Sequence, residues 1–284
     1  MSEMEPHVSP PPVVRGEPVE VSGGVFVIPD GRVPLVPNVG FVVGTRAVLV
    51  VDTGMSLESA AYVLGQAKRL AEGKPLYLTV THFHPEHGFG AQVFADSSTI
   101  VYNREQRDEL RLKGAGYIEM FKGIFGEHVV TALEGVELID PHEVYDGETE
   151  IDVGGHVVTL RTFGRAHTGG DQVVIVDGRV LFGGDLFETR MFPIVPYFPP
   201  DDVDVDGSAW IAVLDALLAL APAVVVPGHG DPVDPAFVVA QRAELAEVAA
   251  LHAAVAAGRI DAATAGRRSP YPDLLWAAAD RNGR

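Results

Sequence analysis

The strongest constraint on the fold of this chain is a repeated local pattern, in which a side chain of a metal-binding type follows a short apolar run and lies beside glycine. Four pieces of sequence show it: LYLTVTHFHPEHG, FGRAHTGGD, VLFGGDLF and VVVPGHG. Together they contain seven candidate ligands, which are His82, His84, Glu86, His87, His167, Asp185 and His229. Apolar runs of this length are typical of strands, and sites are usually built on the loops after strands. The pattern therefore predicts strands whose ends converge on one site.

The types of these side chains favour divalent metal ions. The chain has no cysteine, so any metal must be held by histidine and carboxylate groups, which suit Zn²⁺ and similar ions. His82 and His84 are two residues apart at a predicted strand end, so their side chains can point the same way. The loop after them can turn Glu86 and His87 toward a second point. Six or seven nitrogen and oxygen ligands exceed the need of one tetrahedral ion, and they fit two adjacent ions with a shared ligand.

Composition narrows the classes of partner. The chain has 284 residues, of which 47% are apolar, and a formal net charge of −18. Such a charge argues against a general nucleic-acid surface and against an anionic membrane surface. No apolar stretch approaches the roughly 18 to 20 residues that span a bilayer, and the acidic, proline-rich start of the chain lacks the apolar centre of a signal peptide. We therefore expect a cytoplasmic protein with a small-molecule substrate, no nucleic-acid partner and no membrane partner.

The order of the predicted elements indicates a layered fold. In chain order they are strands within 19–52, a helix over 56–72, a strand over 75–82, a strand over 99–103 and a helix over 104–124. There follow strands within 129–182 that include 129–133 and 136–139, a helix over 206–221, a strand over 223–230, a helix over 235–257 and a short final helix. Each half of the chain runs from strands to helices. Two such halves predict an α/β sandwich with sheets inside and helices outside.

The ligand pieces resemble the metallo-β-lactamase fold superfamily, whose signature is H-x-H-x-D-H followed by a later histidine, a bridging aspartate and a final histidine. The resemblance covers about residues 20–257 and includes VLVVDTG, where Asp52 lies in an early structural motif of the family. It implies a four-layer αββα sandwich of the α+β or α/β class. It also implies a division of the chain into a flexible tail (1–18), a hydrolase domain (19–257) and a C-terminal helical extension (258–284).

The resemblance assigns the candidate ligands to two ions, with zinc as the expected metal and iron or manganese as alternatives. It places His82, His84 and His167 on the first ion, and it places Glu86, His87 and His229 on the second, with Asp185 between them. This chain departs from the family in having Glu86 where the signature has aspartate. Glutamate keeps the charge but adds a methylene group, so the second ion is expected to be weaker, shifted or absent.

The same resemblance implies a hydrolase that uses a metal-activated hydroxide to cleave an ester, thioester, lactone or amide bond of a small molecule. Asp185 and Glu86 are the expected catalytic residues, because they can orient the nucleophile and carry a proton to the leaving group. Alternatives are a β-lactamase, a mononuclear iron oxygenase that resembles persulfide dioxygenases, a nuclease and a non-catalytic metal-binding module. The net charge disfavours the nuclease. A homo-oligomer is a further expectation.

Residues outside this set have simpler expected roles. Asp52 is expected to support a ligand histidine by a hydrogen bond rather than to bind metal. Asp171, in HTGGD, is expected to fix a local turn or to lie behind a ligand. Arg190 and the aromatic residues of FETRMFPIVPYFPP either contact substrate or pack within their loop. Simple structural roles are expected for the remaining histidines, which are His7, His128, His142, His156 and His252.

Overall fold

A computed structural model describes residues 12–189 and 207–271 of the chain. Two sheets form its centre. The first sheet has strands in sequence order: β1 (Val19–Ser22), β2 (Val25–Ile28), β3 (Val39–Val43), β4 (Val48–Val51), β5 (Leu76–Thr79), β6 (Thr99–Asn103) and β7 (Glu143–Tyr145). Strands β1 to β4 pair antiparallel, and β4 to β7 pair parallel. The candidate ligands His82, His84, Glu86 and His87 follow the carboxyl end of β5, in the parallel part of this sheet.

The second sheet has the order β12-β11-β10-β9-β8. Its strands are β8 (Glu148–Ile151), β9 (Val158–Thr162), β10 (Gln172–Val176), β11 (Val180–Glu188) and β12 (Val224–His229). Only β11 and β12 pair parallel, whereas the other neighbours are antiparallel hairpins. Strand β10 is buried at every residue and β11 is buried along its whole length, as expected for the middle of a covered sheet.

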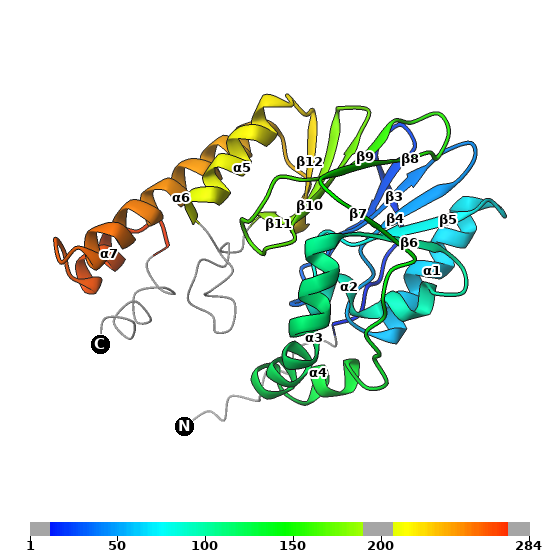
Figure 1. The fold of residues 1–284 in the computed structure, drawn as a ribbon, viewed down its shortest axis with the longest axis horizontal. Coiled ribbons are helices and arrows are strands. Elements are labelled where there is room, and N and C mark those ends of the chain that lie inside the picture. The colour runs from blue at the N-terminus through cyan, green and yellow to red at the C-terminus, as the bar shows by residue number, and fades with distance from the viewer. Residues whose placement is uncertain (1–11, 190–206, 272–284) are drawn as a thin grey trace, which may run out of the picture.

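Helices lie on the outer face of each sheet (Figure 1). The helical elements are α1 (Leu57–Ala71), α2 (Pro85–Gly88), the 3₁₀ turn η1 (Phe89–Phe94), α3 (Arg104–Phe125), α4 (Glu127–Ala132), α5 (Gly207–Ala219), α6 (Pro235–Ala256) and α7 (Ala262–Arg268). Ser56, Asn103 and Asp234 begin α1, α3 and α6, since each side chain accepts a hydrogen bond from a backbone N–H of the first turn. Among the described residues no helix has the length and apolar character needed to cross a membrane.

Three apolar clusters separate the layers. One cluster joins the first sheet to α1 and α3 and includes Phe41, Leu78 and Tyr117. Another joins the second sheet to α5 and α6 and includes Trp210. The third lies between the sheets and takes residues such as Leu49, Leu160 and Phe182 from both of them. Helix, sheet, sheet and helix therefore follow one another, and the predicted αββα sandwich is confirmed.

One stretch predicted as two strands is wrong. Residues 129–133 form part of helix α4 and the turn after it, and 136–139 form no strand. The valine-rich sequence favours strands, but Val129 and Leu133 are both buried and lie four residues apart, which places them on one face of a helix. Packing of that face against the first core overrides the local preference.

The ends of the chain also differ in part from the expectation. Residues 12–18 were expected to belong to a flexible tail, yet Val13 and Val14 are buried and the Val14 N–H donates to the Ser59 hydroxyl. Within 258–271 the chain forms α7, six residues after the end of α6. The rest of the predicted tail, residues 1–11, and of the predicted extension, 272–284, lies outside the described residues, as do Arg190 and the aromatic residues of 190–206.

Candidate metal centre

The seven predicted ligands lie on strand ends and on the loops that follow them. They come from the loop after β5 and helix α2, the β9–β10 loop, β11 and the end of β12. Pro85 begins α2 directly after His84, and this short helix turns Glu86 and His87 back toward the strand end. All seven side chains are buried, with exposed fractions from 0% for His87 to 7% for Glu86. Burial of so many ionisable groups in one place requires a partner for them.

The first group contains His82, His84, His167 and Asp185, each with one ligand atom within 4.8 Å of those of the others. His167 Nε2 and His84 Nδ1 are 3.1 Å apart. His82 Nε2 and His167 Nε2 each lie 3.8 Å from Asp185 Oδ2. Ligands about 2.0–2.1 Å from a tetrahedral zinc ion lie roughly 3.3–3.4 Å from one another. The observed separations lie on either side of that value, so the group has the size of a single-ion site.

The second group contains Glu86, His87, His229 and again Asp185, with the same limit of 4.8 Å. Here the other carboxylate oxygen is involved, since His87 Nε2 lies 3.2 Å from Asp185 Oδ1 and His229 Nε2 lies 3.7 Å from it. One oxygen of Asp185 thus faces each group. This is the arrangement expected of a carboxylate between two neighbouring ions.

Hydrogen bonding gives a test of whether these residues fit metal ions. Among the described residues, the buried atoms of the two groups that make no hydrogen bond include His82 Nε2, His87 Nε2, Glu86 Oε2 and Asp185 Oδ1. Buried polar atoms without partners are rare in folded proteins and costly in free energy. Divalent ions would satisfy these atoms together, so the side chains fit a metal centre.

Contacts behind the ligands fix the ring orientations. Asp52 Oδ2 lies 2.9 Å from His87 Nδ1, and Asp52 Oδ1 accepts the Thr81 N–H at 2.7 Å. His229 Nδ1 lies 2.9 Å from the carbonyl oxygen of Val36. In both histidines Nδ1 is occupied by the protein and Nε2 faces Asp185, as is usual for metal-binding histidines. The predicted supporting role of Asp52 is confirmed.

The loop that carries His167 is tied down by Asp171. Its carboxylate accepts the N–H groups of His167 and Thr168 and the Thr168 hydroxyl, at 2.6 to 3.0 Å. This confirms the local turn predicted for Asp171. Burial raises the pKa of Asp171 to about 7, although the Thr168 hydrogen bonds act in the opposite direction. Asp171 positions His167 and does not belong to either group of ligands.

The β2–β3 loop holds the end of β12 in place. The Asn38 amide donates to the carbonyl oxygens of Pro227 and Gly230 at 2.9 and 2.7 Å, and the Gly230 N–H donates to the Asp30 carboxylate. These buried contacts connect the first sheet to the strand that carries His229. Sequence reasoning did not single out Asp30 or Asn38, because neither residue lies near a ligand in the sequence.

The candidate ligand histidines differ in the direction in which their pKa is shifted. Burial, followed by the neighbouring His87 and His84, lowers the pKa of His82 well below its usual value, and burial lowers the pKa of His167 to about 3. Burial would also lower the pKa of His87, but Asp185 and Asp52 outweigh it and raise that pKa well above its usual value. His82 and His167 are therefore neutral and ready to bind metal, whereas His87 must release a proton first.

Some residues at the centre were not predicted. Tyr117 of α3 stacks on the His84 ring with the centroids 5.2 Å apart, and Trp210 of α5 meets the His167 ring at 5.6 Å. Glu188, at the end of β11, is buried beside Asp185. Its distance of three residues from Asp185 was the available signal in the sequence. Tyr117 and Trp210 come from helices that sequence alone cannot place over the centre.

The described histidines outside the centre have structural positions. His156 Nδ1 lies 2.7 Å from the Asp177 carboxylate, and His142 Nδ1 accepts the Ile100 N–H. His128 and His252 are partly exposed in α4 and α6. This agrees with the simple roles predicted for these four, while His7 lies outside the described residues.

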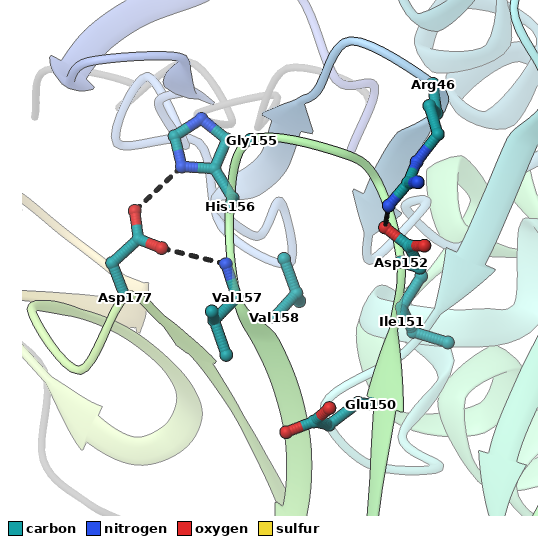
Figure 2. A pocket seen from close by; sticks show the side chains of 9 residues that line it. All are labelled: Arg46, Glu150, Ile151, Asp152, Gly155, His156, Val157, Val158 and Asp177. Carbon is teal, nitrogen blue, oxygen red and sulfur yellow. Dashed lines mark hydrogen bonds and ion pairs between the residues drawn. The ribbon is translucent and has the colours of Figure 1, made fainter.

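A separate hollow of about 600 Å³ lies near His156 (Figure 2). It is formed by the ends of β8 and β10, the start of β9 and the β3–β4 turn, with Arg46 paired to Asp152 on one side. These segments lie at one end of the strands, and the candidate ligands lie at the other end. None of the seven predicted ligands lines this hollow, so it is not the metal centre.

Comparison with known proteins identifies the family. Residues 32–229 match the model of the Metallo-beta-lactamase superfamily. A linear primary-alkylsulfatase of Pseudomonas sp. (strain ATCC 19151) is 24% identical over 216 residues, which cover 66% of this chain. The chain spans only 40% of the length of that alkylsulfatase.

Solved structures show the same fold. The DIM-1 metallo-beta-lactamase superposes with a TM-score of 0.60 at 19% identity, covering 82% of this chain and 99% of that one. The inverting sec-alkylsulfatase Pisa1 from Pseudomonas sp. gives a TM-score of 0.66 at 15% identity, covering 92% of this chain and 47% of its own. With the family match over more than half of its length, this chain belongs to the Metallo-beta-lactamase superfamily.

Proposed function

We propose that this chain is a zinc-dependent hydrolase with a two-ion centre, which cleaves an ester, thioester, lactone or amide bond of a small molecule. The observation that carries the proposal is the position of Asp185. Its two oxygens face two separate groups of buried ligands, within 3.8 Å of His82 and His167 on one side and of His87 and His229 on the other. A single-ion protein would not need this double set.

The residues divide between the ions as the geometry groups them. His82, His84 and His167 would hold one ion, Glu86, His87 and His229 would hold the other, and Asp185 would contact both. When bound, the ions would make a water molecule more acidic and would polarise the bond under attack. The aromatic rings of Tyr117 and Trp210 back the first group and restrict the directions from which water can reach it.

Asp185 and Glu86 supply the acid and base groups of the proposed reaction. Burial alone would raise the pKa of Asp185, but His87 and His229 hold it well below the usual range, so Asp185 is a carboxylate at neutral pH. It can accept a hydrogen bond from the attacking water and orient it. Glu86 belongs to the second group beside Asp185, and we assign to its carboxylate the transfer of the proton that the attacking water loses to the leaving group.

A sulfate ester is a second candidate substrate. The linear primary-alkylsulfatase matches 66% of this chain, and the sec-alkylsulfatase shares its fold. A β-lactam remains a third candidate, because the fold is also that of the DIM-1 metallo-beta-lactamase. Since one fold carries many activities, the fold alone does not choose between these bonds. Cytoplasmic location and a homo-oligomer stay predictions of the sequence.

Metal analysis combined with a substrate panel tests the proposal. Protein purified without added metal should contain about two zinc ions per chain, and Asp185→Asn should reduce the metal content and abolish turnover. The panel contains activated esters, thioesters, lactones, amides, alkyl sulfates and a β-lactam. The control is His156→Gln, which changes a histidine at the far end of the strands and should behave as wild type. About one iron per chain together with oxygen uptake would instead support the mononuclear oxygenase.

A further inference from the structure

A third carboxyl group lies beside the second group of ligands. Glu188 ends β11, three residues after Asp185, and in the strand register it pairs with His229 of β12. Its side chain is 4% exposed, and Oε2 is buried without a hydrogen-bond partner among the described residues. An unpartnered buried carboxyl oxygen is costly, so a ligand that would satisfy it is the simplest explanation of its position.

The side chain of Glu188 lies beside that of Asp185. Burial raises the pKa of Glu188 well above its usual value, the nearby carboxylates of Asp185 and Glu86 raise it further, and His87 acts in the opposite direction. Each of these neighbours belongs to the second group. The Glu188 backbone N–H donates to the Gln241 side chain of α6, which also donates to the Leu186 carbonyl oxygen. These contacts fix the backbone from which the carboxyl group projects.

We propose that Glu188 is a further ligand of the second ion, so that this site can also hold a divalent ion of higher coordination number, such as Mn²⁺. This inference rests on the proposed two-ion centre. With Glu188 the second site offers two imidazoles and three carboxylates, more donors than a tetrahedral ion takes, and mostly oxygen. The first site offers three imidazoles and one carboxylate, which suits zinc.

A purely structural role for Glu188 makes a different prediction. In that case Glu188 would be a neutral acid that donates a hydrogen bond to the Asp185 carboxylate. A glutamine side chain can donate the same hydrogen bond, so Glu188→Gln would leave metal binding unchanged. If Glu188 binds the ion as a charged oxygen ligand, the same substitution removes a negative ligand and weakens binding. Glu188→Gln therefore separates the two roles.

The experiment measures manganese binding directly. Metal-free full-length protein receives one equivalent of Zn²⁺ and is then titrated with Mn²⁺, while the signal of free Mn²⁺ is followed by electron paramagnetic resonance. Wild type should bind one Mn²⁺ per chain. Glu188→Gln should bind it at least about tenfold more weakly, the scale seen when groups around a metal are lost. Glu188→Asp, which keeps the charge, should lie between them. The control Glu244→Gln, which removes a carboxylate of α6 that accepts from Tyr271, should match wild type.

The outcomes distinguish this inference from the proposed function. Equal manganese affinity of wild type and Glu188→Gln, with two ions bound in each, overturns the role of Glu188 and leaves the two-ion hydrolase intact. Fewer than two ions in wild type overturns the two-ion centre itself, and with it the inference. Circular dichroism of each metal-free variant confirms that it is folded. A variant that is unfolded without metal is compared through Glu188→Asp instead, where an affinity equal to that of wild type also counts against the proposal.

Discussion

At the scale of single residues, three of the ligand histidines contact a protein oxygen through Nδ1. Their other ring nitrogen faces the centre. His87 does this through Asp52, His229 through the carbonyl oxygen of Val36, and His82 Nδ1 lies 3.2 Å from the Thr81 hydroxyl. Such contacts fix the tautomer and ring direction before a metal arrives. Within the described part of the chain, Glu86 Oε2 has no such contact, so the length of this side chain matters more.

Glu86→Asp should tighten the second site. Shortening the side chain by one methylene restores the residue of the family signature and removes one rotatable bond that metal binding must freeze. We expect a higher ratio of metal to protein after dialysis against a weak chelator, and an altered rate of hydrolysis. The ratio is measured by elemental analysis on both proteins. An unchanged ratio together with an unchanged rate would show that Glu86 does not touch the metal.

His167 should make the metal-free protein sensitive to acid. Its pKa is about 3 in the folded state, against the ordinary histidine value of 6.5 in an unfolded chain, so between these values the unfolded chain binds a proton that the folded one does not. Stability therefore falls as the pH drops below 6.5, by about 1.4 kcal/mol per pH unit from this group. His82 acts in the same direction, whereas His87, with its raised pKa, adds stability that is present below pH 6.5 and is lost as the pH rises above it.

Urea unfolding of metal-free protein at pH 7 and pH 5.5 measures this effect. His167→Gln should lose less unfolding free energy between the two pH values than wild type does. Only the difference between the two proteins is interpreted, because the other histidines contribute to both. Identical losses in wild type and variant would contradict the assignment of a low pKa to His167.

At the scale of elements, the centre depends on the close approach of β11 and β12 at their carboxyl ends. Gly228, next to the ligand of β12, lies so near β11 that a Cβ atom there would be 1.8 Å from Asp185 Oδ1. The pairing of these parallel strands also shifts register between Gly184 and Glu188, which brings Glu188 opposite His229. Asp185 can therefore lie between the two groups of ligands only because residue 228 has no side chain.

Gly228→Ala should displace Asp185 and weaken both ions together. Overpacking of this kind costs about 1–3 kcal/mol of unfolding free energy. The matched control is Gly65→Ala in α1, where a Cβ would meet nothing within 4 Å and where alanine should stabilise the helix by about 0.5–1 kcal/mol. Urea unfolding and metal content are measured for both. Normal metal content in Gly228→Ala would show that Asp185 tolerates the displacement.

Much of this element-scale arrangement could be predicted, because each ligand follows an apolar strand and strands of one sheet end together. The order of most strands and helices, and the position of the seven candidate ligands at strand ends, needed only these local patterns, whereas the division of the seven between two ions came from the family resemblance. Helix α4 could not be predicted, since its valines favour strands and only contact with the first core decides otherwise. Glu188 was missed because its spacing of three residues from Asp185 does not by itself place both side chains on one face of a strand, and the register shift that brings Glu188 opposite His229 is a tertiary feature.

At the scale of the whole molecule, the ligands are divided between the two sheets. His82, His84, Glu86 and His87 follow a strand of the first sheet, whereas His167, Asp185 and His229 belong to the second. A metal centre between them adds to the contact already made by the apolar cluster that the sheets share. Bound ions should therefore stabilise the packing of one half of the sandwich on the other.

Removal of metal should lower the melting temperature of the protein without unfolding it at room temperature. An ion present at about 100 times its dissociation constant stabilises the native state by about 2.7 kcal/mol, which corresponds to roughly 5–10 °C for a chain of this size. Thermal unfolding is followed by circular dichroism with and without a chelator, and the loss should be reversed by added Zn²⁺. The chelator should have no effect on a variant that lacks both His82 and His87, and an effect there would indicate a site elsewhere.

The hydrogen bonds of Asn38 and Asp30 to the end of β12 have a consequence for a chain that is cleaved into two fragments. Two polypeptides made by cutting within 190–206 would leave β12 and its histidine on the later fragment, while the loop that orients them stays on the earlier one. Neither fragment would carry a complete set of donors. Divalent cations should then promote reassociation of the two fragments, so recovery of the folded protein from its fragments would depend on metal ions.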